Sequence, residues 1–387
     1  MDKTIVIGIY SHPEAYPPTL SAINLLANRY SKVVVVCRNT LPTCWEYPPN
    51  VSLVFTTRYY FNYEIENISA LRKIGYFLRF AMTLLLQCRK YKAETLLCYD
   101  AVPLMAAYIL KKTGLLKHSS LWYHNHDTID PKKIGKYSLL WFAFRTEKKA
   151  FDYIRLFTLP AAERCSYFPM DQYKGKTVIL PNYPSLNIFQ TSDLPKVLSD
   201  EIRLVYQGSL GPFHGFEEII PLLNKTIAGK SISLTLIGKM RPGYREKLEQ
   251  LARQYKTEDK LFFVPLQPYV QLPAITAQYH IGLATHRPYN VTYSTGGTAS
   301  NKIFEYAACS LPVILYDHDN YRKHLGNYPW TFFTNLEPDS LTDIIGRIAE
   351  NYAGLSQQAK ATFLTTLNFE KAFEKILYKL INGANAK

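Results

Sequence analysis

The sequence has few of the features that mark disulfide-stapled, zinc-binding or membrane-spanning proteins. Its six cysteines form no CxxC pair and have no regular spacing, so we expect free thiols in a reducing cytosol. They are Cys37, Cys44, Cys88, Cys98, Cys165 and Cys309. No run reaches the ~18 uninterrupted apolar residues of a membrane-spanning helix. The longest candidate, FLRFAMTLLLQC, contains Arg79.

Acidic residues are also scarce, with 31 Asp and Glu against 45 Lys and Arg, a net charge of +14. Residues 71–149 hold 15 basic and 5 acidic residues, whereas the chain after residue 185 is almost balanced. Basic residues interleaved with aromatic and aliphatic ones suit a helix in an anionic membrane interface. A core helix with solvated basic ends would fit as well. Nucleic-acid binding is disfavoured, because no helix-turn-helix, RNP, zinc-finger or KH pattern is present.

Short apolar strands alternate with helical stretches along the chain. The opening TIVIGIY has no basic stretch before it and no small-residue cleavage site, so we expect a first strand rather than a signal peptide. Further strands are expected at 32–37, 51–56, 94–99, 120–125, 153–159, 202–208, 231–238, 260–265, 280–285 and 312–317, with helices at 19–30, 67–92, 101–113 and 136–151.

Near-continuous apolar strands separated by helices are typical of a parallel sheet covered on both faces. A stretch rich in Pro, Asn and Ser follows KTVIL and reads as a linker. The sequence therefore predicts an α/β protein of two Rossmann-like, doubly wound domains facing across a cleft. The expected domains are 1–185 and 186–366. A helix at 367–387 is expected to pack back toward the first.

The segment 298–314, TASNKIFEYAACSLPVI, has the composition of a polar turn, a short helix and a buried strand. Lys302 and Glu305 are three residues apart and share a helix face. Ser300 or Thr298 can cap this helix and leave amides free at its positive end. A cation and free amides suit a diphosphate, and a carboxylate one turn further on can accept hydrogen bonds from ribose hydroxyls. A Lys–Glu ion pair on a surface helix is the alternative.

NKIFEYAACSLPVI resembles the signature of GT-B glycosyltransferases of the family-4 type (glycosyltransferase group 1) and related bacterial polysaccharide enzymes. VYQGSLGPFHGFEEII, LTLIGKM, VILPNYPS and FTLPAAERCSYF resemble further segments of that family in the same order. The resemblance implies that Glu305 binds the donor ribose and Lys302 its diphosphate. It places Gly208, Ser209, Lys239, Leu266 and Ser300 on the same donor site, with Leu266 at the level of the base. It also implies that the domain 186–366 binds the nucleotide sugar and that the domain 1–185 binds the acceptor.

The sequence departs from the family pattern at three positions. Gly297 stands where the first of the family's paired glutamates falls, which leaves retention or inversion of the anomeric centre open. His214 replaces the common lysine of the phosphate loop, and Ser310 replaces a glycine. We therefore interpret the chain as a divergent member.

The stretch WYHNHDT places His124, His126 and Asp127 at the end of an expected strand. An imidazole or carboxylate there can take the proton of an acceptor hydroxyl or orient the acceptor, and we predict His126 or Asp127 in this role. His124 is expected to be structural. No cluster of metal ligands is visible, and the DHD at 317–319 is interpreted as coincidence.

These features predict a metal-independent hexosyl- or glycuronosyltransferase in bacterial surface glycan synthesis. It would need no cofactor, take a UDP-sugar rather than a GDP-sugar, and act on a glycolipid or glycan. We expect a cytoplasmic protein that contacts the inner face of an anionic membrane through residues 71–149. A nucleotide-sugar 2-epimerase of the same architecture and a non-catalytic binding protein are the alternatives.

Overall fold

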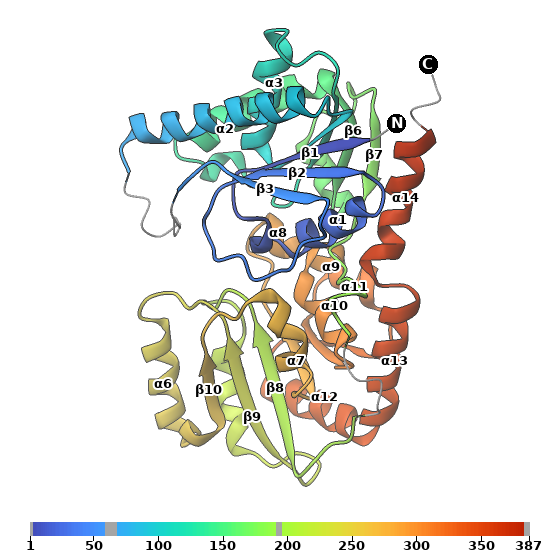
Figure 1. Cartoon of the computed structure of the whole chain (residues 1–387). Helices are drawn as coiled ribbons and strands as arrows, with labels where there is room; N and C mark the ends of the chain where they lie inside the picture. Colours follow the sequence, from blue (N-terminus) through green and yellow to red (C-terminus); the bar gives the residue numbers. More distant parts are fainter. Residues whose placement is uncertain (1–2, 59–67, 191–195, 383–387) are drawn as a thin grey trace. The chain divides into compact units, whose positions relative to one another are not determined.

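The computed structural model describes residues 3–58, 68–190 and 196–382. The chain divides into two compact units. One consists of Met1–Pro181 together with Phe373–Lys387, and the other of Asn182–Ala372. Each unit is built on its own parallel sheet (Figure 1).

The sheet of the first unit is parallel throughout. Its strands are β1 (Thr4–Ile9), β2 (Lys32–Cys37), β3 (Val51–Phe55), β4 (Thr95–Tyr99), β5 (Ser120–His124), β6 (Ile154–Leu159) and β7 (Lys176–Ile179). They lie in the order β3-β2-β1-β4-β5-β6-β7, so the chain reverses direction between β1 and β4. Ligands of such sheets bind at the carboxyl ends of the strands, next to this reversal.

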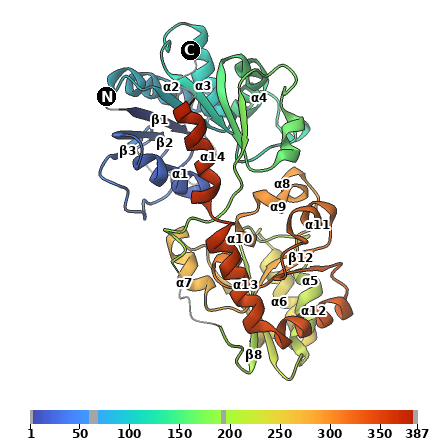
Figure 2. The same ribbon diagram turned by 90° about the vertical axis from the view of Figure 1, so that its right-hand side faces the viewer.

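Helices cover both faces of this first sheet. They are α1 (Pro17–Ala27), α2 (Ala70–Lys90), α3 (Ala101–Lys112), α4 (Leu139–Ala150) and α14 (Phe369–Asn382). On one face α3 packs between α2 and α4, over a core that includes Phe80, Leu84 and Tyr123. On the other face Phe373 of α14 lies 6.1 Å, ring to ring, from Trp122 of β5. Figure 2 shows α1 and α14 on this second face.

The second unit repeats the arrangement with a parallel sheet in the order β10-β9-β8-β11-β12-β13. Its strands are β8 (Glu201–Gln207), β9 (Ser231–Ile237), β10 (Leu261–Val264), β11 (Ile281–Ala284), β12 (Val313–Tyr316) and β13 (Thr331–Thr334). Its helices are α5 (Phe216–Ile219), α6 (Tyr244–Tyr255), α7 (Leu272–Thr276), α8 (Val291–Ser294), α9 (Gly296–Ala299), α10 (Asn301–Ala308), α11 (Asp319–Leu325), α12 (Pro338–Glu350) and α13 (Tyr352–Thr365). Helix α10 packs against α13.

The doubly wound α/β architecture predicted from the sequence is confirmed, and the predicted strands lie within a residue or two of those in the structure. The edge strand β13 was missed, because its four residues TFFT carry too short a pattern. Residue 67 of the helix expected at 67–92, and residues 191–195 of the expected linker, lie outside the described residues. All six cysteines are free. In the described ranges no helix has the length and apolarity to cross a membrane.

Candidate functional site

Helix α10 is held against the carboxyl end of β8 and against β11 by Tyr306. Its hydroxyl accepts a hydrogen bond from the backbone N–H of Gln207, the last residue of β8, at 2.9 Å. Its ring lies on β11 at Gly282, where an added Cβ would come within 2.3 Å of the ring. The pair Tyr306 and Gly282 therefore fixes where the neighbouring side chains of α10 lie.

Glu305 lies inside a cluster of polar side chains at the end of β8. It is only 4% exposed. Its Oε2 accepts a hydrogen bond from Nε2 of Gln207 at 2.6 Å, and Oε1 of Gln207 accepts one from Thr276 at 2.7 Å. The Tyr269 hydroxyl also hydrogen-bonds the carboxylate. Burial raises the pKa of Glu305 to about 7, against the opposing effects of Gln207, Tyr269 and Lys302. The alternative of an ion pair on a surface helix does not fit a carboxylate buried in this way.

The side chain of Lys302, one turn before Glu305 on α10, lies next to Gly208, the glycine that follows β8. Its Cε would lie 3.5 Å from a Cβ added at Gly208, and its Nζ lies 4.8 Å from the centre of the Tyr206 ring. Burial lowers the pKa of Lys302 to about 8, and Glu305 opposes this shift. The ammonium is therefore near the glycine loop, where an anion would approach the backbone.

A glycine after β9 allows the loops after β8 and β9 to touch. Gly238 has a φ of 140°, and a Cβ there would come within 1.9 Å of the carbonyl oxygen of Gly208. Backbone hydrogen bonds join the loops, including one of 2.8 Å from Leu210 N to Lys239 O. Only glycine tolerates this approach and this φ. The two loops and the start of α10 thus form one edge of the sheet.

The other residues predicted for the donor site lie at this same edge. Ser209 and Lys239 follow β8 and β9 and are exposed. Leu266, two residues beyond β10, is 66% exposed. Ser300 is the N-cap residue of α10. Its side chain makes no capping hydrogen bond, so the cap that the sequence suggested at Ser300 is absent. Its extended backbone ends the preceding turn without that bond.

Two of the three positions that depart from the family pattern, Gly297 and His214, have a local explanation. At Gly297 an added Cβ would lie 2.9 Å from Asn320 oxygens and from the Cβ of His324, so no glutamate fits there. His214 is buried, with Nδ1 2.6 Å from the carbonyl oxygen of Gly211. Burial and the nearby Lys302 lower its pKa to about 4. His214 is therefore neutral at physiological pH and does not replace the charge of a lysine.

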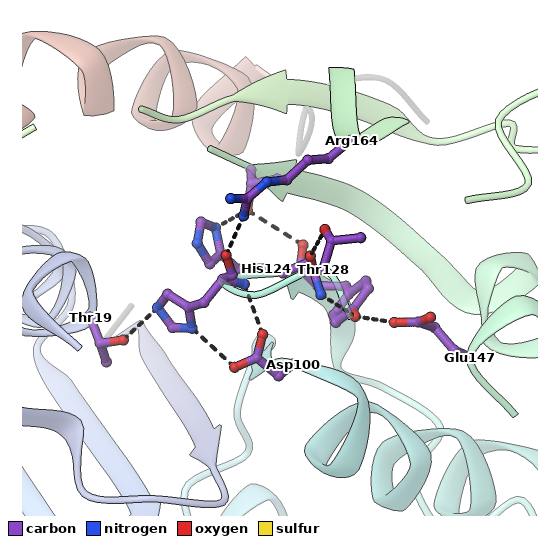
Figure 3. A network of polar contacts seen from close by, with 10 residues as sticks. Thr19, Asp100, His124, Thr128, Glu147 and Arg164 are labelled. Carbon is purple, nitrogen blue, oxygen red and sulfur yellow. Dashed lines mark hydrogen bonds and ion pairs between the residues drawn. The ribbon is translucent and has the colours of Figure 1, made fainter. Parts of the chain in front are cut away.

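In the first unit, the carboxyl ends of β4 and β5 carry a second polar cluster (Figure 3). Asp100 accepts two hydrogen bonds from His126, one from the backbone N–H at 2.8 Å and one at the ring Nδ1 at 3.2 Å. The other ring nitrogen of His126 lies 2.9 Å from the Thr19 hydroxyl. Arg164, itself buried, donates to the carbonyl oxygen of His126 at 2.7 Å. Residues from α1, from the end of β4 and from the segment after β6 thus converge on His126.

Two tyrosine rings also stack on the imidazole of His126. The rings of Tyr16 and Tyr99 stack on it, each with its centre 4.6 Å away. Asp100 itself has a φ of 66° and a ψ of 176°, a region that only glycine adopts readily. Backbone strain of this kind persists only where the surroundings over-determine it, and it clusters at functional sites.

His124 and Asp127 flank this imidazole. His124 is buried, and its Nδ1 lies 2.8 Å from the Thr158 hydroxyl, as suits a structural residue. Asp127 is exposed. The structure thus brings together His126 and Asp100 but leaves Asp127 open to solvent. Over the described ranges, no three His, Cys, Asp or Glu side chains gather as a metal site would need.

Sequence reasoning missed four residues of these clusters. Asp100 directly follows a predicted strand, so its place at a carboxyl end was readable, but its pairing with His126 depends on β4 and β5 being neighbours. Gln207, Thr276 and Tyr269 lie 98, 29 and 36 residues before Glu305, and no local pattern joins them to it.

Comparison with known proteins agrees with these two units. The model of the family "Glycosyl transferases group 1" matches residues 192–362, which lie within the second unit. No curated protein matches this chain by sequence. The resemblance to a divergent group 1 glycosyltransferase, predicted from the motif around Glu305, is confirmed.

Solved structures with the same fold span the whole chain. Sucrose-phosphate synthase from Thermosynechococcus elongatus is 14% identical, with a TM-score of 0.71 over 99% of this chain and 100% of that one. HepE from Anabaena, solved with UDP, is 14% identical, with a TM-score of 0.66 over 98% and 100%. WaaG, a glycosyltransferase of lipopolysaccharide biosynthesis, is 12% identical, with a TM-score of 0.64 over 95% and 98%. The fold is therefore GT-B.

Proposed function

We propose that this protein transfers a sugar from a nucleotide diphosphate sugar to a hydroxyl group of an acceptor. The family match to residues 192–362 supports sugar transfer as the class of reaction. The observation that carries the proposal is the arrangement around α10, with a buried carboxylate, a lysine and two touching glycine loops at one edge of the sheet. A nucleoside diphosphate offers ribose hydroxyls and phosphates with the complementary chemistry.

In the proposed donor complex, Glu305 accepts hydrogen bonds from the ribose and Lys302 binds the diphosphate. Gly208, Ser209, Lys239 and Ser300 lie where the backbone or a side chain reaches the phosphates, and Leu266 lies beside the base. The charge of Lys302 matters more here than in a site with a loop lysine, because His214 is neutral. The UDP and UDP-glucose complexes of HepE support a UDP-sugar as donor.

The acceptor is proposed to bind in the first unit, with its hydroxyl near His126 or Asp127. As the hydroxyl oxygen attacks the anomeric carbon, the bond from that carbon to the phosphate oxygen breaks and the nucleoside diphosphate leaves. His126 or Asp127 takes the hydroxyl proton, and Asp100 holds the imidazole in place. No residue stands for the missing glutamate at Gly297, so we assign no stereochemical outcome.

The finer parts of the proposal concern the acceptor and its setting. We propose a hexosyl or glycuronosyl donor group, a glycolipid or glycan acceptor, and a role in bacterial surface glycan synthesis. The naming of WaaG as a lipopolysaccharide enzyme supports this setting. We propose that no metal ion is needed, since Lys302 and the helix amides stabilise the leaving diphosphate. The reaction would take place at the cytoplasmic face of a membrane.

Calorimetric titration of UDP and GDP into the wild-type protein and into Glu305→Ala tests the donor site. We expect UDP to bind the wild type, GDP to bind more weakly, and the variant to bind neither. Glu374→Ala, an exposed glutamate on α14, is the matched control and should bind UDP normally. Undiminished UDP binding by Glu305→Ala would refute the donor assignment.

Incubation with the donor alone separates a transferase from an epimerase. A 2-epimerase would convert the nucleotide sugar to its isomer without an acceptor, whereas a transferase releases little product until an acceptor is added. NMR of the sugar region distinguishes the two. Binding of the nucleotide sugar without any turnover on a panel of acceptors would favour the alternative of a non-catalytic binding protein.

A further inference from the structure

Helix α2 carries a stripe of large apolar side chains that face solvent. The stripe consists of Leu71, Ile74, Leu78, Met82 and Leu86, which are 81%, 52%, 59%, 54% and 55% exposed. Their spacing of three or four residues places them on one side of the helix. The opposite side of α2 is buried in the core of the first unit through Phe77, Phe80 and Leu84. The helix is therefore apolar on both sides, and the sheet covers only one of them.

The charge around the stripe has a single sign. Residues 70–90 contain five basic residues and no acidic one. At about 3.6 residues per turn, Arg72, Arg79 and Lys90 fall along one edge of the stripe. An apolar face with cations along its edge is the arrangement of helices that lie in the interface of an anionic membrane. A second copy of this chain is a poor occupant, because two such faces would bring two sets of cations together without a carboxylate on either helix.

The start of α2 projects past the carboxyl edge of the sheet. Phe80 packs against Tyr10, the residue that follows β1, with ring centres 5.1 Å apart. Phe77 is still buried in the core, so the helix extends past this edge over residues 70–76, roughly 10 Å at 1.5 Å per residue. Residues 71–75 are all exposed, and a Cβ added at Gly75 would meet nothing within 4 Å. Figure 1 shows this end of α2 reaching beyond the strands. Asp100 and His126 lie at the same edge.

We propose that the exposed stripe of α2 is the surface by which this protein docks on a membrane of anionic lipid. The stripe enters the headgroup region, and the edge cations bind lipid phosphates. Docking would hold the carboxyl edge of the first sheet, with His126, close to the lipid surface. That last consequence rests on the proposed function, since it presents a lipid-linked acceptor hydroxyl to the imidazole; the docking itself does not.

Co-sedimentation of the full-length protein with vesicles tests the docking surface. We expect binding to vesicles of equal parts phosphatidylcholine and phosphatidylglycerol, and little binding to phosphatidylcholine alone. Leu71→Gln/Leu78→Gln should weaken binding by at least about tenfold, because both side chains enter the interface. The matched control Val197→Gln/Leu364→Gln, which removes two exposed apolar side chains of the second unit, should bind like the wild type. Equal effects of the two double variants would overturn the proposal.

A second pair of double variants tests the basic residues along the edge of the stripe. Arg72→Gln/Arg79→Gln should weaken binding to the anionic vesicles by about tenfold or more, since each cation near such a surface contributes separately. Lys174→Gln/Lys176→Gln, with the same loss of charge elsewhere in the first unit, should have a smaller effect. Equal binding of the wild type to both vesicle types would also overturn the proposal, as would a wild-type dimer that the α2 variants dissociate. UDP titration of the same samples shows independently whether the donor site works.

Discussion

At the scale of single residues, Glu305 combines two properties that usually exclude each other. It is buried and bonded to Gln207 and Tyr269, as a structural residue would be, and it lies beside a lysine and two glycine loops, as a ligand-binding residue would. The two roles have different signatures. Burial of the charge affects the stability of the free protein, whereas ligand contact affects binding.

The raised pKa of Glu305 predicts a pH-dependent stability. A folded-state pKa of about 7, above the ordinary value of 4.5, means that the stabilising, protonated form is fully present below about pH 4.5 and is lost as the pH rises through 7. The free energy of unfolding of the wild type therefore falls by about 3 kcal/mol over this pH range. Glu305→Gln should lack it, so the difference in free energy of unfolding between variant and wild type should grow from pH 5 to pH 8 in urea titrations.

The same variant separates the two roles. Glu305→Gln should be at least as stable as the wild type at pH 8 and yet bind UDP at least about tenfold more weakly, because an amide accepts fewer ribose hydrogen bonds. A variant that is both stable and fully competent in binding would show that Glu305 is only structural.

Asp100 is the second residue with a specific expectation. Asp100→Asn leaves the strained backbone in place but turns one of the two acceptors facing His126 into an amide donor. We expect kcat to fall by at least about tenfold, with KM for the nucleotide sugar little changed, because the proposed donor site is in the other unit. Asp152→Asn, an exposed aspartate of the same unit, is the control. A normal kcat for Asp100→Asn would remove Asp100 from the positioning of the imidazole.

At the scale of elements, the edge proposed to bind the donor depends on backbone contact between the loops after β8 and β9 rather than on side chains. The loops after β8 and β9 are close because Gly238 has no Cβ to meet the Gly208 carbonyl, and α10 packs beside them because Gly282 admits the Tyr306 ring. A sequence shows such glycines as loop residues only. Their partners in space explain why they are glycines.

Gly238→Ala should therefore damage the second unit severely. The new Cβ would meet the Gly208 carbonyl, so we expect a loss of more than about 2 kcal/mol in stability together with the loss of UDP binding. Gly243→Ala is the matched control: its φ is also positive, at 73°, but no atom lies within 4 Å of its Cβ position. It should cost about 1 kcal/mol from backbone strain alone and retain binding. Thermal unfolding with and without UDP distinguishes the two.

At the scale of the whole molecule, the positive charge is unevenly divided. Residues 71–149 carry most of the excess, and the part of the chain after residue 185 is almost neutral. The proposed membrane contact draws on this excess, whereas the proposed donor site depends on a few placed groups such as Lys302. The two binding events should therefore respond differently to ionic strength.

Raising the salt concentration from about 0.05 to 0.5 M shortens the Debye length severalfold and should release the protein from anionic vesicles. UDP binding should weaken much less, because Lys302 is half-buried beside the glycine loops and is less screened than a surface cation. Sedimentation and calorimetry at matched salt concentrations measure both. An equal salt dependence would contradict the separation of the two surfaces.

The sequence by itself determined the architecture, because the alternation of apolar strands and helices leaves few other folds. Through the resemblance of its motif it also singled out Lys302 and Glu305 as candidates for the donor site. It also located the excess of charge. Only the tertiary structure decided what surrounds these residues. Gln207, Tyr269 and Thr276 reach Glu305, and Asp100 reaches His126, through strand neighbours that are distant in the chain. The exposure of the α2 stripe was likewise undecided, because an apolar helix pattern indicates burial without showing which of its sides the sheet leaves uncovered.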